Sequence, residues 1–142
     1  DIMTYTHSIS VDLDFSEAVD QTRQALADQG FGVITEVDMR ATFTAKLGPE
    51  AADAVGDYLI LGACNPTLAS RALAGDPHIG ALLPCNVVIR RSDGDEQTTI
   101  ETIDPATMVE LSGSPLVREV ADDADRRLKA ALASMGGSAG LH

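Results

Sequence analysis

Near the middle of the chain stands the stretch YLILGACNP, Tyr58 to Pro66, whose first seven residues form an unbroken apolar run. A run of this kind is typical of a central strand buried on both faces of a sheet. Asn65 is a good helix N-cap, and Pro66 suits the first helical position because its missing N–H would have no partner there. The stretch therefore predicts a buried strand that leads directly into a helix over residues 66–74.

Further strands are predicted on both sides of this stretch. Residues 3–12 and 31–37 are rich in β-branched and aromatic residues. Residues 85–90 and 97–103 flank the turn sequence Ser-Asp-Gly-Asp at 92–95, which predicts an antiparallel hairpin. Residues 50–56 are polar and small, and we expect them to form a bridge without regular structure.

Two long amphipathic helices are predicted over residues 14–30 and 115–135. Asp14 and Glu17 resemble a capping box, Gly30 is a C-cap, and Ser114 is the N-cap of the second helix. A short helix or an irregular segment is expected over 38–47, and a short helix over 105–111. This order of elements favours an α+β fold, a mainly antiparallel sheet with the helices packed on one face.

Composition restricts the functional classes. The 142 residues suit a single domain, which we assign to residues 3–136, followed by a flexible tail at 137–142. The net charge of −12 disfavours binding to nucleic acid and to anionic membrane surfaces. No apolar stretch is long enough to cross a bilayer, and no secretory signal is recognised, so we expect a cytoplasmic protein.

Cys64 and Cys85 are the only cysteines, and each is followed by asparagine. If the strand that begins at Cys85 runs beside the strand that ends at Cys64, the two thiols come together. The sequence therefore predicts a paired-thiol site. The alternative is that both cysteines are small buried residues of the core.

A paired-thiol site leaves two functions open. One is binding of a thiol-reactive small molecule, sulfane sulfur or a soft metal such as Cu(I). The other is a thiol-redox or thiol-transfer enzyme that uses the same pair. Zinc is disfavoured because His7, His78 and His142 have no recognisable spacing from either cysteine. Asp104 and His78 are the candidate acid–base residues, and no cofactor is identified.

The chain resembles a known family in Tyr58–Pro66, Leu82–Val87 and Gly30–Val33, and the doubled Cys-Asn motif is the most specific feature. These segments are similar to the domain-of-unknown-function 302 family. The resemblance implies a TATA-binding-protein-like β-α-β4-α arrangement and a dimer. The hairpin at 85–103 is also expected to leave an exposed strand edge. Together with the resemblance, this edge predicts a homodimer. The family's hallmark positions, which we expect to contact a ligand, are Cys64, Asn65, Pro66, Pro84, Cys85 and Asn86.

Overall fold

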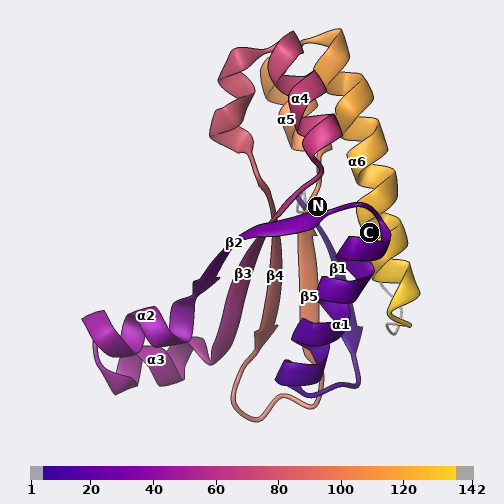
Figure 1. The fold of residues 1–142 in the computed structure, drawn as a ribbon. Coiled ribbons are helices and arrows are strands. Elements are labelled where there is room, and N and C mark those ends of the chain that lie inside the picture. The colour runs from indigo at the N-terminus through magenta and orange to yellow at the C-terminus, as the bar shows by residue number, and fades with distance from the viewer. Residues whose placement is uncertain (1–4, 137–142) are drawn as a thin grey trace.

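The computed structural model describes residues 5–136, so the tail expected at 137–142 and the start of the domain at residue 3 lie outside the described residues. The strands are β1 (Thr6–Val11), β2 (Gly32–Asp38), β3 (Asp57–Cys64), β4 (Cys85–Arg91) and β5 (Thr98–Ile103). The helices are α1 (Phe15–Asp28), α2 (Met39–Lys46), α3 (Pro49–Val55), α4 (Pro66–Gly75), the 3₁₀ helix η1 (Pro77–Leu82), α5 (Ala106–Ser112) and α6 (Pro115–Ser134). Figure 1 shows their arrangement.

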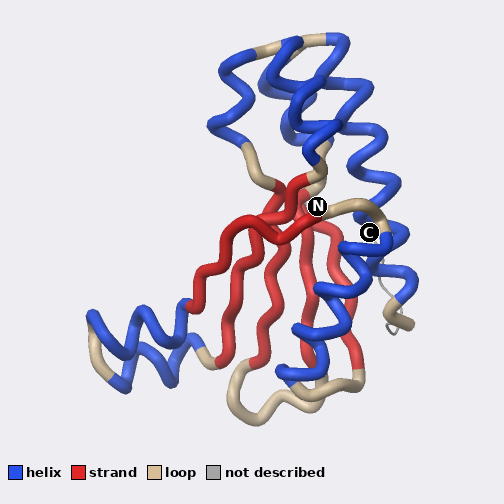
Figure 2. The backbone as a smooth tube through the Cα atoms, viewed as in Figure 1, coloured by secondary structure: helices blue, strands red, loops and turns tan. Residues whose placement is uncertain are grey.

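The five strands form one antiparallel sheet in the order β1-β5-β4-β3-β2 (Figure 2). The chain follows the implied β-α-β4-α order, with α2 and α3 inserted before β3 and with α4 and η1 inserted before β4. The predicted α+β fold is therefore confirmed. The expected edge on the 85–103 hairpin is wrong, because β4 and β5 are both interior and the edges are β1 and β2.

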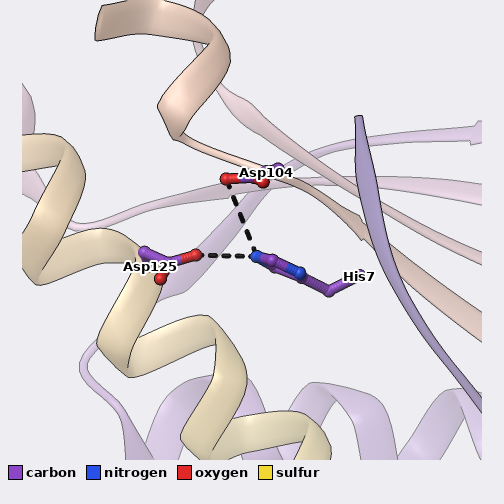
Figure 3. Close-up of side chains that lie close together, drawn as sticks. All are labelled: His7, Asp104 and Asp125. Atoms are coloured by element: carbon purple, nitrogen blue, oxygen red, sulfur yellow. Dashed lines mark hydrogen bonds and ion pairs between the residues drawn. The ribbon is translucent and has the colours of Figure 1, made fainter. Parts of the chain in front are cut away.

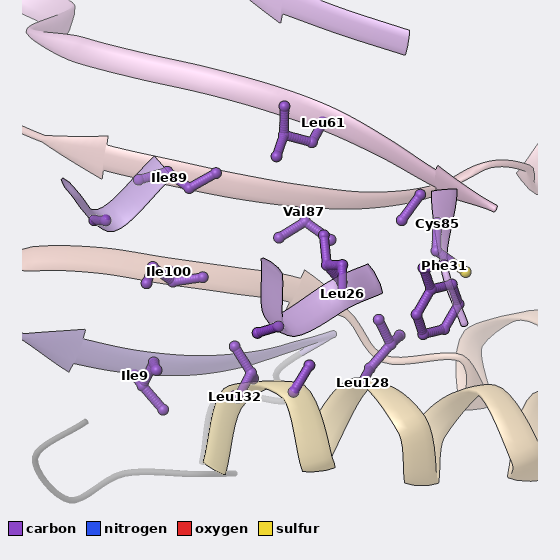
Figure 4. Close-up of a cluster of buried hydrophobic side chains, with 14 of the residues drawn as sticks. Ile9, Leu26, Phe31, Leu61, Cys85, Val87, Ile89, Ile100, Leu128 and Leu132 are labelled. Carbon is purple, nitrogen blue, oxygen red and sulfur yellow. The ribbon is translucent and has the colours of Figure 1, made fainter. Parts of the chain in front are cut away.

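The two long helices α1 and α6 pack on the same face of the sheet, as predicted. The N-cap of α1 is Asp14, whose side chain accepts a hydrogen bond of 2.8 Å from the Glu17 N–H. The N-cap of α6 is Ser114, which accepts one from the Val117 N–H. The apolar side chains between helices and sheet form the main core (Figure 4), which includes Leu26, Leu61, Val87, Ile89, Ile100, Leu128 and Leu132.

A second apolar cluster lies beyond one end of the sheet, where α4, η1, α5 and the first half of α6 form a helical cap (Figure 1). Its buried residues are Leu68, Ala72, Ile79, Met108, Val117, Val120, Ala121 and Ala124. Because α6 contributes to both clusters, it ties the cap to the sheet. Asn65 and Pro66 begin α4 as predicted.

The helices α2 and α3 extend from the opposite end of the sheet (Figure 1). The expectation of an irregular bridge at 50–56 was wrong, since Pro49–Val55 is helical with Pro49 in the first turn. This short helix buries only Ala52, so it has no apolar stripe that sequence periodicity could reveal. Arg40 holds the extension to the sheet through an ion pair of 2.9 Å with Asp57. In the described part of the chain, no helix has both the length and the apolar character that a membrane span requires.

Candidate functional site

The two cysteines lie on neighbouring strands, but they do not form a thiol pair. Cys85 is paired with Ala63 in the β3–β4 ladder, and both residues are buried on the helix-covered face. Successive side chains in a strand point to opposite faces, so Cys64, the last residue of β3, does not point alongside Ala63 and Cys85, although it borders the same cavity at the strand end. Neither cysteine is in a disulfide, and their side chains are not in close contact. The predicted paired-thiol site is therefore wrong.

Cys85 behaves as a core residue, which was the alternative interpretation. Its side chain is 6% exposed and belongs to the main core together with Phe31 (Figure 4). Burial disfavours the thiolate and raises the pKa of Cys85 to about 11. Cys64 is half-buried at the end of β3.

A cavity of about 30 Å³ lies where the main core meets the helical cap. Four of the six predicted site residues line it, namely Cys64, Asn65, Pro84 and Cys85, while Pro66 and Asn86 are exposed and do not. The remaining lining residues are apolar and come from both clusters: Phe31, Ala63, Leu68, Ala69, Ala72, Leu83, Met108, Val117, Val120 and Ala124. We call this space the junction cavity.

Asn65 is the one amide side chain in the lining of the junction cavity. Its Oδ1 accepts a hydrogen bond of 3.1 Å from the Leu68 N–H, which confirms its predicted role as the N-cap of α4. Capping uses the oxygen and thereby fixes the direction of the amide nitrogen. That nitrogen lies close to Gly30, where an added Cβ would come within 3.1 Å of both Asn65 Nδ2 and Arg127 Nη1. An amide nitrogen and a guanidinium nitrogen therefore meet at Gly30, next to the cavity-lining Phe31, and the guanidinium nitrogen donates to the Gln29 carbonyl oxygen at 2.9 Å.

A second polar cluster joins His7, Asp104 and Asp125 (Figure 3). His7 is on β1, Asp104 directly follows β5, and Asp125 is on α6. The His7 Nε2 atom lies 2.7 Å from Asp125 Oδ1 and 3.7 Å from Asp104 Oδ1. His7 is 4% exposed, so one buried imidazole faces two carboxylates.

Asp104 and His78 are the candidate acid–base residues predicted from the sequence, and of these only Asp104 belongs to this cluster. His78 is instead exposed on η1, where its backbone N–H donates to Asp76. A signal for His7 was present, because it alternates with Ile9 and Val11 and must therefore share their buried face. For Asp125 the sequence provided only a weak indication of its position. It directly follows Ala124, a buried residue on the apolar face of α6.

Comparison with known proteins agrees with the fold. A solved structure described as the uncharacterized conserved protein DUF302 from Bacillus stearothermophilus is similar, with a TM-score of 0.78 and 28% sequence identity. The likeness covers 92% of this chain and 98% of that one. A search of curated proteins gave no match. Residues 7–135 match the family described as Domain of unknown function DUF302, and the chain belongs to this family.

Proposed function

We propose that this protein is a binding module for a small carboxylate with a short apolar chain, held in the junction cavity. The observation that supports this is the composition of the cavity wall, which is apolar except for Asn65 and the two cysteines. An apolar wall with one placed polar group is the usual design of a small-molecule site. The six predicted site residues thus contribute to the proposal through the four that line the cavity.

The volume of the cavity sets the size of the ligand. Each water-sized group, such as a methyl or methylene, needs roughly 10–15 Å³ of cavity volume. The 30 Å³ of the junction cavity therefore accommodates about two to three such groups. A propyl or ethyl chain fits, and a longer chain has to project from the site.

The polar end of the ligand is inferred from the donors beside Gly30. The Asn65 amide nitrogen can donate to a carboxylate oxygen while its oxygen continues to cap α4. The Arg127 guanidinium supplies positive charge nearby, while its Nε donates to Asp123 at 2.7 Å and its Nη1 donates to the Gln29 carbonyl oxygen at 2.9 Å. A carboxylate suits this position, because it can accept from the Asn65 amide nitrogen and is attracted by the guanidinium charge, and hydrogen bonds to a charged acceptor are the stronger ones.

The test is a titration of ¹⁵N-labelled protein with acetate, propionate, butyrate and hexanoate at constant ionic strength, followed by NMR. We expect saturable shifts of the Phe31, Cys64 and Leu68 amide signals. Affinity should rise roughly fourfold per methylene up to butyrate, as expected for burial of each CH₂. It should then level off at hexanoate, because the cavity is full.

Two pairs of variants localise the binding. Asn65→Asp keeps a good N-cap but replaces the donor by an anion, so it should abolish binding. Its control is Asn86→Asp, on the exposed side of β4, which should not change binding.

The second pair tests the volume of the cavity. Ala69→Met fills the cavity and should weaken butyrate binding at least tenfold, whereas Ala74→Met, exposed on the same helix, should have no effect. Absence of saturable shifts for all four acids would refute the proposal.

We also propose that the protein forms a homodimer through the β2 edge. This edge strand carries two exposed apolar residues, Ile34 and Val37, with exposed fractions of 61% and 43%. An unpaired strand edge can pair with a second copy of itself in antiparallel orientation, which is a self-complementary contact. The family resemblance supports the same association.

A further inference from the structure

Three residues distant in the sequence place one nitrogen and two carboxylate oxygens around a common point. One ligand atom from each of His7, Asp104 and Asp125 lies within 4.8 Å of the others (Figure 3). We propose that this cluster binds a divalent first-row transition metal ion, with Zn²⁺ as the preferred ion. Its ligands are His7 Nε2 and one oxygen of each aspartate. The site is separate from the junction cavity and does not depend on the function proposed above.

The observed distances suit a tetrahedral ion. Zinc holds nitrogen and oxygen ligands at about 2.0–2.2 Å, which places neighbouring ligand atoms roughly 3.3 Å apart. The separations from His7 Nε2 are 2.7 Å to Asp125 and 3.7 Å to Asp104. One carboxylate must withdraw and the other must approach, each by about half an ångström. Rotation of the two aspartate side chains provides such shifts without movement of the strands.

The other nitrogen of His7 gives independent support. Among the described residues, the buried side-chain atoms without a hydrogen-bond partner are His7 Nδ1 and Thr102 Oγ1. These two residues are directly paired across β1 and β5. A metal-bound histidine carries its proton on the other ring nitrogen and donates it to a nearby acceptor. The Thr102 hydroxyl lies on the residue that faces His7; the two atoms are not hydrogen-bonded to each other in this structure, so Thr102 becomes that acceptor only when its side chain turns toward the ring.

The donor set and the exposure of the site define the class of ion. One imidazole and two carboxylates suit Zn²⁺ or Mn²⁺, whereas Cu(I) prefers sulfur ligands. The side chains of Asp104 and Asp125 are 30% and 26% exposed, so an ion can enter from solvent and water can complete its coordination. Lys129 Nζ lies 3.0 Å from Asp125 Oδ2, and its positive charge opposes that of the bound ion.

The experiment uses the full chain after removal of metals with a chelator. Co²⁺ is titrated first, because its visible absorption reports the geometry of a site that takes Zn²⁺. Zn²⁺ is then added to displace the bound Co²⁺. Calorimetry gives the affinity for Zn²⁺. We expect one Co²⁺ per chain, with bands typical of four or five nitrogen and oxygen ligands, and displacement by Zn²⁺. His7→Gln and Asp125→Asn should each weaken Zn²⁺ binding more than tenfold, and Thr102→Val about tenfold.

Two further variants separate a built site from general attraction to an acidic protein. Asp122→Asn, exposed on the same helix, removes an equal charge and should leave the affinity unchanged. Lys129→Met should strengthen binding by roughly threefold to tenfold, because it removes the opposing charge. Because His7 is buried, Asp125→Asn decides the test if His7→Gln does not fold. Absence of stoichiometric Co²⁺ binding, or equal weakening by Asp122→Asn and Asp125→Asn, would overturn the proposal.

Discussion

Cys85 faces Ala63 across the β3–β4 ladder, and not Cys64. This register places the Cys85 thiol in the core and leaves Cys64 half-buried at the end of β3, so both residues border the junction cavity without forming a thiol pair. The two cysteines, alike in their sequence neighbours, are therefore different in chemistry.

The first prediction is that Cys85 in the folded protein reacts very slowly with iodoacetamide. Burial, and to a smaller extent the charge of Cys64, raises its pKa from an ordinary 9.0 to about 11, which leaves roughly a hundredfold less thiolate at pH 8; burial, the larger cause, persists without Cys64 and also restricts access. A Cys64→Ser variant isolates this thiol, and its rate is measured by mass spectrometry in buffer and in denaturant. The folded rate should be at least about a hundredfold lower. Similar rates in the two conditions would show that Cys85 is not a core residue.

The second prediction concerns Gly62 on β3. A Cβ at this position would collide with the Thr35 hydroxyl and come within 2.7 Å of the Pro84 ring. We expect Gly62→Ala to lower the free energy of unfolding by about 1–3 kcal/mol, as overpacking does. Urea denaturation measures the change. Gly32→Ala is the matched control on β2, because the added Cβ would lie 3.9 Å from its nearest neighbour, the Cys64 carbonyl oxygen, and it should change stability by less than about 0.5 kcal/mol.

The third prediction is a pH dependence that originates at Glu101 on β5. Desolvation raises its pKa, but hydrogen bonds from Ser8 and Arg90 outweigh this, and the pKa is lowered from its ordinary value of 4.5. A group with a lowered folded pKa stabilises the protein above its unfolded pKa, and this contribution is lost as the pH falls through the folded value. Stability should therefore decrease below pH 4.5 less steeply in Glu101→Gln than in the original protein. Equal slopes in urea titrations across this range would contradict the assignment.

The fourth prediction tests the β2 edge as the dimer contact. Sedimentation at micromolar to high micromolar concentration should detect a dimer, and Ile34→Lys with Val37→Lys should produce a monomer, because a charge on an edge strand prevents pairing. Leu111→Lys, at a residue that is 68% exposed on α5, should leave the dimer intact. A monomer at all concentrations in the original protein would refute the proposal.

Local signals in the sequence were sufficient for most of the fold. The caps at Asp14, Asn65 and Ser114 all accept the hydrogen bonds that their positions predict, because capping depends on residues only three apart. The continuous apolar run of β3 likewise indicated its place between two other strands, but the predicted burial on both faces was wrong, because the helices cover one face and leave Tyr58 and Ile60 half-buried. The helix α3 was missed because its stability depends on packing against α2 and not on an apolar stripe of its own.

The sites depended on register and on contacts between distant segments. The sequence determined that β3 and β4 carry one cysteine each. A shift of one residue in a strand ladder reverses the face of every side chain, so only the register decided that the thiols do not pair. In the same way, alternation placed His7 on a buried face, whereas its approach to Asp125 required α6 to cross β1, a contact between residues 118 positions apart. Hydrogen-bond capping and strand periodicity are local and can be derived from the sequence. The meeting of side chains from separate elements is set by the packing of the whole sheet and its helices.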